Sequence, residues 1–264
     1  NVDIDGVLET DNLTIGGAQG SDGQVLTSTG SGVGWEDASG GGSSVTFKEA
    51  GTNFANSIMV GDDSTGTLSS ATGNTALGID VFAALTSGTD NVAVGFNALP
   101  ALTSGALNTG IGKDALQGVT TAQYSTALGA NAGSVITTGN GNTAIGANTM
   151  TSGTTAANNT IVGTHAATAM TDGIGNTISG TVSAIALTTG DYNNTLGYGA
   201  GYAITTGDEN ICIGNSAALA LTTGSDNIAI GSNALNTQTT VTVEIAIGFE
   251  ALKVASNAGS NVAV

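Results

Sequence analysis

A short alternation of polar and apolar residues recurs along most of the chain. Asn227–Gly231 is one copy of it, and residues of like kind stand at every second position. A period of two is typical of a β-strand, because successive side chains of a strand point to opposite faces. Turn signals bound each copy, with GxN after it and TTGxxN before the next one. The pattern therefore predicts short strands joined by turns, with little or no helix.

The alternation keeps a strict register, because a glycine ends it every 17 residues. A unit of this length is too short for a helical hairpin, but one or two strands and two turns close one coil of a β-solenoid. At about 4.8 Å between neighbouring strands, about twelve coils predict a rod of about 55 to 60 Å. The glycines of this register are Gly61, Gly78, Gly95, Gly112, Gly129, Gly146, Gly163, Gly180, Gly197, Gly214, Gly231 and Gly248.

Three columns of the repeat have predicted structural roles. The aliphatic residue before each glycine, such as Ile213 or Ile230, is predicted to form the stacked core of the coils. The glycine is predicted to have positive φ or to lie where coils approach closely. The asparagine four places before it is predicted to stand at a turn, to tolerate a left-handed backbone and to stack into an amide ladder. This column contains Asn74, Asn91, Asn108, Asn142, Asn159, Asn176, Asn193, Asn210, Asn227 and Asn261.

The N-terminal segment lies outside the 17-residue register. Residues 1–38 are predicted to contain a β-hairpin with strands at Val25–Ser28 and Val33–Trp35, and residues 39–44 to form a Gly/Ser linker. Residues 45–264 are predicted to form the all-β solenoid. The chain begins at Asn1 and stops within a repeat, so we expect it to be a piece of a longer protein.

Composition and charge argue against several classes of function. The chain has three lysines, no arginine and a net charge of −17. Binding to nucleic acid needs clustered basic residues, and Lys48, Lys113 and Lys253 are far apart in the sequence. The same acidity disfavours an anionic membrane surface, and no apolar run approaches the roughly 18 residues that span a bilayer. We therefore expect no nucleic-acid partner and no membrane insertion.

Residues that carry catalytic chemistry are few and scattered. Paired acids such as Asp208 and Glu209, like Asp62 and Asp63 or Glu36 and Asp37, stand in polar turns, where solvated charge is the expected role. His165 is the single histidine, so a transition-metal site would need three copies of it around the axis of a trimer. The sequence motifs of nucleotide-binding loops, serine hydrolases and zinc proteases are absent. We expect that the protein is not an enzyme.

The recurring aspartates and the single cysteine are two further candidates for chemistry. Carboxylates recur near the asparagine column at Asp90, Asp191, Asp208 and Asp226, and Ca²⁺ prefers oxygen ligands. The GGxGxD pattern of calcium-binding β-rolls is nevertheless absent from the repeats, so we expect no metal and no cofactor. Cys212 stands in a column held mostly by alanine, which predicts a small buried residue and not a catalytic thiol.

Several repeat copies resemble a known family. The segments NVAVGFNALPALTSG, NTAIGAN, NICIGNSAALALTTG and NIAIGSNAL are similar to repeats of bacteriophage tail-fibre and appendage proteins, and the opening GGAQGSDGQVLTSTGSGVGWEDASGGG is similar to their connector segments. The NxAIG core is more loosely similar to the head repeats of trimeric autotransporter adhesins, which have a shorter repeat. The resemblance implies a homotrimer in the virion or otherwise at a cell surface. Its partners would be other tail proteins and a host glycan or protein receptor.

One column of small residues predicts where the chains of a trimer would meet. If the aliphatic column faces the core, the alternate column of the strand faces outward and forms an exposed apolar stripe. Three closely packed rods would cover that stripe. The candidate interface residues are Ala76, Ala93, Ala144, Cys212, Ala229 and Ala246.

The leading hypothesis is a structural and adhesive fibre segment that supports attachment to a host cell. A bacterial adhesin head domain, an ice-binding solenoid and a glycan-degrading tailspike enzyme are the alternatives. The repeat departs from its consensus around residues 149–185, at Thr149, Met150, His165 and Ser179. Since specific recognition usually needs a varied surface on a rigid scaffold, we expect any contact with a ligand on the side of the rod to lie there.

Overall fold

The chain forms two compact units. The computed structural model describes residues 14–15, 18–19, 24–28, 33–37, 46–49, 54–61, 65–254 and 260–264. The units are Asn1–Val45 and Thr46–Val264. The described residues contain no helix, which confirms the all-β prediction.

The first unit contains two small antiparallel pairs. Strand β1 (Thr14–Ile15) pairs with β2 (Ala18–Gln19), and β3 (Gln24–Ser28) pairs with β4 (Val33–Asp37). The second pair is the hairpin that the sequence predicts. The predicted linker at residues 39–44 lies outside the described residues.

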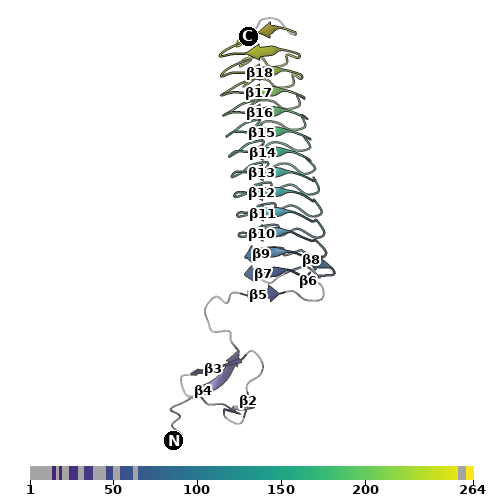
Figure 1. Cartoon of the computed structure of the whole chain (residues 1–264), viewed down its shortest axis with the longest axis vertical. Helices are drawn as coiled ribbons and strands as arrows, with labels where there is room; N and C mark the ends of the chain where they lie inside the picture. The colour runs from purple at the N-terminus through teal and green to yellow at the C-terminus, as the bar shows by residue number, and fades with distance from the viewer. Residues whose placement is uncertain are drawn as a thin grey trace. The chain divides into compact units, whose positions relative to one another are not determined.

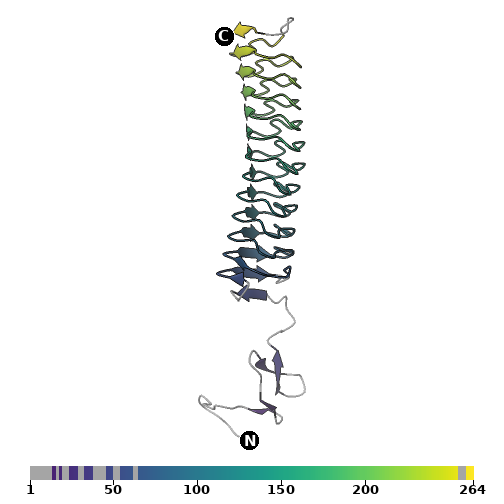
Figure 2. The ribbon, with the colours of Figure 1, turned by 90° about the vertical axis from the view of Figure 1, so that its right-hand side faces the viewer.

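The second unit is a β-solenoid, in which each coil adds one strand to a sheet of 14 strands (Figure 1). Its parallel strands each pair with the next one 17 residues along the chain, as Ala93 pairs with Gly110. Figure 2 shows that these strands line one side of the coils. The parallel strands are β7 (Ile58–Gly61), β9 (Thr75–Gly78), β10 (Val92–Val94), β11 (Thr109–Ile111), β12 (Thr126–Leu128), β13 (Thr143–Ile145), β14 (Thr160–Val162), β15 (Thr177–Ser179), β16 (Asn194–Leu196), β17 (Ile211–Ile213), β18 (Ile228–Ile230), β19 (Ile245–Ile247) and β20 (Val262–Ala263).

Three further strands lie at the N-terminal end of this unit. Strand β5 (Thr46–Glu49) pairs antiparallel with β7 and forms the first strand of the large sheet. Strands β6 (Phe54–Ala55) and β8 (Ala71–Thr72) form a separate parallel pair. The stack therefore begins with an antiparallel strand and continues in parallel pairs.

The middle residue of each strand faces the inside of its coil, so the predicted orientation of the strands is wrong. The alanine-column residues Ala76, Ala93, Ala144, Cys212, Ala229 and Ala246 are 0 to 2% exposed. Their neighbours in the aliphatic column point outward, as the exposed fractions of 47% for Leu128 and 53% for Leu196 demonstrate. The alanine column is thus the core of the single chain and cannot contact a second one.

The narrow interior of the coil explains this arrangement. Opposite the strand, two larger side chains such as Leu99 and Leu102 point inward and are completely buried. A small residue at the strand centre leaves space for both, whereas an isoleucine there would compete with them for the same volume. In the coils of Ala76, Ala93 and Gly110, the core therefore combines one small residue at the strand with two large residues opposite it.

Candidate functional site

A buried ladder of asparagine side chains joins successive coils. The Nδ2 atom of Asn91 donates hydrogen bonds to Oδ1 of Asn74 and to the backbone oxygen of Gly105, both over 3.0 Å. The same Oδ1 atom accepts a hydrogen bond from the backbone nitrogen of Asn91. Both asparagines are completely buried, so every polar atom of the amide needs such a partner. The predicted amide ladder is confirmed.

The ladder has a residue other than asparagine at three coils, and at the first of them the hydroxyl of Ser57 accepts the backbone N–H of Asn74 over 2.8 Å. Ser125 donates its backbone N–H to Oδ1 of Asn108, and its hydroxyl accepts the backbone N–H of Asn142 over 3.4 Å. Glu244 is 1% exposed, and its carboxylate accepts hydrogen bonds from the backbone nitrogen and Nδ2 of Asn261. All three residues keep the connection between backbone and side chain, but none supplies the amide donor of the asparagine.

Left-handed backbone occurs at other positions than the ladder. In one coil, Gly95 has φ 129°, Asn97 57°, Leu99 51° and Leu107 60°. The residue just before each ladder asparagine is left-handed, as Leu107 is before Asn108, and the ladder asparagines themselves are not among the positive-φ residues. The predicted left-handed backbone at the ladder is therefore wrong, because the turn lies one residue earlier.

The glycine column marks the closest approach between coils. From Gly61 to Gly231, a Cβ atom added to each of these glycines would lie 2.1 to 2.7 Å from the nearest backbone atom of the next glycine in the column. Their φ angles between 125° and 146° are also unfavourable for other residues. Both predicted reasons for the glycine register are confirmed.

A second ladder runs along the threonines that lie eight places after the glycines. The hydroxyl of Thr103 donates to the backbone oxygen of Thr120 over 3.0 Å, and that of Thr188 donates to Thr205 over 3.0 Å. These hydroxyls are therefore used to connect coils. In most coils, the residue directly after the ladder threonine is an exposed Ser or Thr, as Thr121 is after Thr120.

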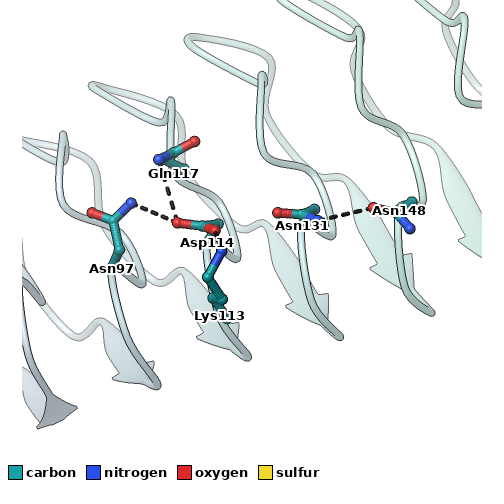
Figure 3. Close-up of polar contacts among 6 residues, drawn as sticks. All are labelled: Asn97, Lys113, Asp114, Gln117, Asn131 and Asn148. Carbon is teal, nitrogen blue, oxygen red and sulfur yellow. Dashed lines mark hydrogen bonds and ion pairs between the residues drawn. The ribbon is translucent and has the colours of Figure 1, made fainter.

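The residues two places after the glycines form a third, partly exposed row (Figure 3). Nδ2 of Asn97 donates to Oδ1 of Asp114 over 2.6 Å, and Nδ2 of Asn131 donates to Oδ1 of Asn148 over 2.9 Å. Lys113 forms an ion pair with Asp114. The pKa of the Asp114 carboxyl is lowered mainly by the hydrogen bond from Lys113 and to a smaller extent by the hydrogen bond from Asn97. The row is a partly exposed counterpart of the buried ladder.

The candidate metal ligands are placed apart or have structural partners. His165 is an exposed member of this third row, with Nε2 3.4 Å from Nδ2 of Asn148. Oδ1 of Asp191 accepts the backbone N–H of Ile174, and Oδ1 of Asp208 accepts that of Asp191. Within the described ranges, no three His, Cys, Asp or Glu side chains gather as a metal site would require. Asp62 and Asp63 lie outside these ranges.

Cys212 is the free cysteine at the centre of β17. Burial raises the pKa of its thiol to about 12, so the reactive thiolate is strongly disfavoured at neutral pH. Its predicted role as a small buried residue is confirmed, and its candidacy for an interface between chains is wrong.

The strands present a continuous uncharged surface that the sequence interpretation assigned to the core. We call it the outer sheet face, and define it as the first and third residues of strands β10–β19 together with Thr75 and Leu77 of β9. No position of this face has a charged residue. The signal was available in the sequence, because the asparagine and alanine columns are two residues apart and share one face of the strand. Its aliphatic third residues are Leu77, Val94, Ile111, Leu128, Ile145, Val162, Leu196, Ile213, Ile230 and Ile247.

A hollow interrupts this face at Ser179, the position where the aliphatic column has a hydroxyl. Its volume is about 230 Å³. One wall belongs to the irregular region 149–185, and the other wall is formed by strands β16 and β17. The lining residues are Thr177, Ser179, Asn194, Thr195, Leu196 and Ile213.

Comparison of the chain with protein-family models, with curated proteins and with solved structures finds no match. Among the described residues, none of the segments is a helix long and apolar enough to cross a bilayer. The function must therefore be argued from the chain's own geometry.

Proposed function

We propose that this chain is a segment of a structural and adhesive fibre, a phage tail fibre or similar appendage, which supports attachment to a host cell as a homotrimer. The observation that carries the proposal is the unbroken parallel register from β9 to β19, in which equivalent residues are always 17 apart. A structure that extends by identical coils provides length and stiffness. We assign most of it to the shaft.

The arrangement of polar groups supports a mechanical role. Backbone pairing connects each coil to the next, and buried asparagines and threonine hydroxyls add hydrogen bonds between most coils. Several carboxylates also have structural partners. Those of Asp114, Asp191, Asp208 and Glu244 accept hydrogen bonds from backbone amides, amide side chains or a lysine. A tailspike enzyme would need a cleft with converging carboxylates, whereas the lining of the hollow at Ser179 contains no carboxylate.

Removal of whole coils tests the shaft function. Deletion of residues 198–231 removes two complete periods and joins Gly197 to Ser232, so the register is kept. We expect the rod to fold, to shorten by about 10 Å in electron micrographs, and to leave the adsorption of particles to host cells largely intact. The matched variant lacks residues 198–205, which is half a coil. It is expected to unfold locally because core residues would change faces.

Two results would contradict the proposal in different ways. Equal damage to folding by both deletions would refute the register argument. A whole-coil deletion that folds but no longer allows adsorption would refute the shaft function and place the receptor contact in the deleted coils. The hollow at Ser179 and the exposed His165 remain our candidates for a contact with a host glycan or protein on the side of the rod.

Ice binding is a second candidate, favoured by one observation. Five successive strands place threonine on the outer sheet face, in a regular column beside the aliphatic residues. The column then continues with Asn194 and Ile211, which interrupts the hydroxyl array. Thermal hysteresis at micromolar protein would support this candidate over the fibre. The threonines are Thr109, Thr126, Thr143, Thr160 and Thr177.

A further inference from the structure

We propose, resting on the fibre function above, that the outer sheet face is the surface through which copies of this chain pack along their length. The alanine column is excluded as the interface because it is buried inside each chain. The occupant of the outer sheet face is a second copy of the same chain, lying parallel with equivalent strands at the same level. Rotation about a common axis gives this arrangement and leaves no open ends to the association.

The outer sheet face is apolar over a large area. Its exposed members include Leu77, Leu128 and Leu196, which are 47 to 53% exposed. Eleven strands of three residues cover about 50 by 10 Å, or roughly 500 Å² in projection. Eight of its 22 positions are Thr, Ser or Asn, so the apolar part is roughly 300 Å², at the lower end of the range of about 300 to 600 Å² for the largest apolar patches of monomeric proteins. Three copies that turn these faces toward a common axis would together bury about 1,500 Å², which exceeds the roughly 1,000 Å² at which specific interfaces begin.

The spacing of the face favours a second copy over another kind of partner. Ridges of side chains recur with every strand, at about 4.8 Å, along the whole length of the rod. On a protein surface with a different spacing, the side chains would no longer fit between these ridges after a few strands. A parallel copy has the identical spacing and can keep its ridges in the grooves of the first copy throughout.

The distribution of charge identifies the side on which two copies can approach. Each chain has a net charge of −17, so two rods repel one another. The acidic residues Asp90, Asp172, Asp208, Glu209 and Asp226 are exposed, and none of them belongs to the outer sheet face. Contact through that face therefore removes apolar surface from water while no charge is buried.

The experiment compares arginine substitutions on and away from the face. Leu128→Arg and Ile230→Arg place a charge in the outer sheet face, whereas Thr121→Arg and Thr223→Arg make the same change in charge at exposed residues elsewhere in the coil. Light scattering of the unaltered protein should give a multiple of the chain mass of 25.4 kDa. The two face variants should weaken the association at least about 100-fold and keep their β-sheet circular dichroism. The threonine variants should assemble normally.

Two outcomes would overturn the inference, and both differ from a failure of the fibre function. Face variants that assemble as well as the threonine variants would show that the copies meet elsewhere. A folded unaltered protein with the mass of one chain would show that they do not meet at all. Failure of the fibre function is detected separately, by the adsorption of particles that have the whole-coil deletion.

Discussion

At the scale of single residues, the coil depends on backbone conformations that are unfavourable in isolation. Leu99 and Leu116 are large apolar residues with φ 51°, a region that bulky residues rarely adopt. Both side chains are completely buried. Burial of a leucine contributes about 1.5 to 3 kcal/mol, which exceeds the usual cost of about 1 to 2 kcal/mol for a left-handed residue. The turn is therefore maintained by the core beneath it.

The glycine column yields the first prediction at this scale. Gly112→Ala should lower the free energy of unfolding by at least about 2 kcal/mol, since φ is 131° and the new Cβ would lie 2.5 Å from the Gly129 carbonyl oxygen. The measurement is chemical denaturation followed by circular dichroism. Gly199→Asn is the control, because φ is 59° there and the nearest atom to an added Cβ is 3.7 Å away. Equal losses in the two variants would refute the close-approach explanation.

The interrupted amide ladder yields the second prediction. Ser125→Asn should raise the free energy of unfolding by about 1 kcal/mol, because the new Nδ2 can donate to Oδ1 of Asn108 and to the backbone oxygen of Gly139. The equivalent atom of Asn108 makes the corresponding bonds to Asn91 and Ala122. Ser125→Ala, which removes the hydroxyl that accepts from Asn142, should be destabilising. A lower thermal midpoint for Ser125→Asn than for the unaltered protein would contradict the ladder's role in stability.

At the scale of one coil, two positions of the core exchange a small and a large residue between some coils. Most strands have a small central residue, and the position six residues later is then often large, as with Ala93 and Leu99. In two neighbouring coils the order is reversed, with Ile161 followed by Ala167 and Ile178 by Ala184. All of these residues are completely buried. Such exchange is expected where close packing fixes the total volume but not its distribution.

The orientation of the strand yields a prediction at the scale of the element. Ala229→Arg should lower the free energy of unfolding by at least about 3 kcal/mol and reduce the β-sheet circular dichroism signal. The reason is that a charge would enter a completely buried position without a partner. The adjacent Ile230→Arg should keep the fold, since Ile230 lies on the outer sheet face. Thermal unfolding followed by circular dichroism measures both. Comparable folding in the two variants would mean that the strand is oriented the other way.

The sequence was sufficient for the architecture but not for the orientation of the strand. The glycine register predicts the coil, the parallel stacking and the all-β class, because a backbone constraint repeats without exception. The two faces of the strand are both apolar in coils such as the one at Ile228–Ile230, so hydrophobicity alone cannot distinguish them. Size decides instead, since the coil interior admits alanine beside two large residues. The hollow at Ser179 cannot be predicted from the sequence, because its walls come from three successive strands.

At the scale of the whole second unit, the surface repeats itself from coil to coil. A partner that reads the consensus positions meets the same chemistry at every level of the stack and cannot select one site. Selection therefore depends on departures such as His165, Ser179 and the coil that contains Tyr198 and Tyr202, both exposed. These departures give a uniform rod a few distinguishable levels.

The pairing of each strand with the one 17 residues away also has a kinetic consequence. Dividing this separation by the 264 residues of the chain gives a relative contact order of about 0.06. All-β sandwiches have values of about 0.16 to 0.22 and fold in milliseconds to seconds, whereas helical bundles begin near about 0.07 and fold in microseconds to milliseconds. Because each pairing is this local, closing one coil costs little loop entropy, and folding can propagate from coil to coil. Each coil can close as soon as the ribosome has released it, with the preceding coil as its template.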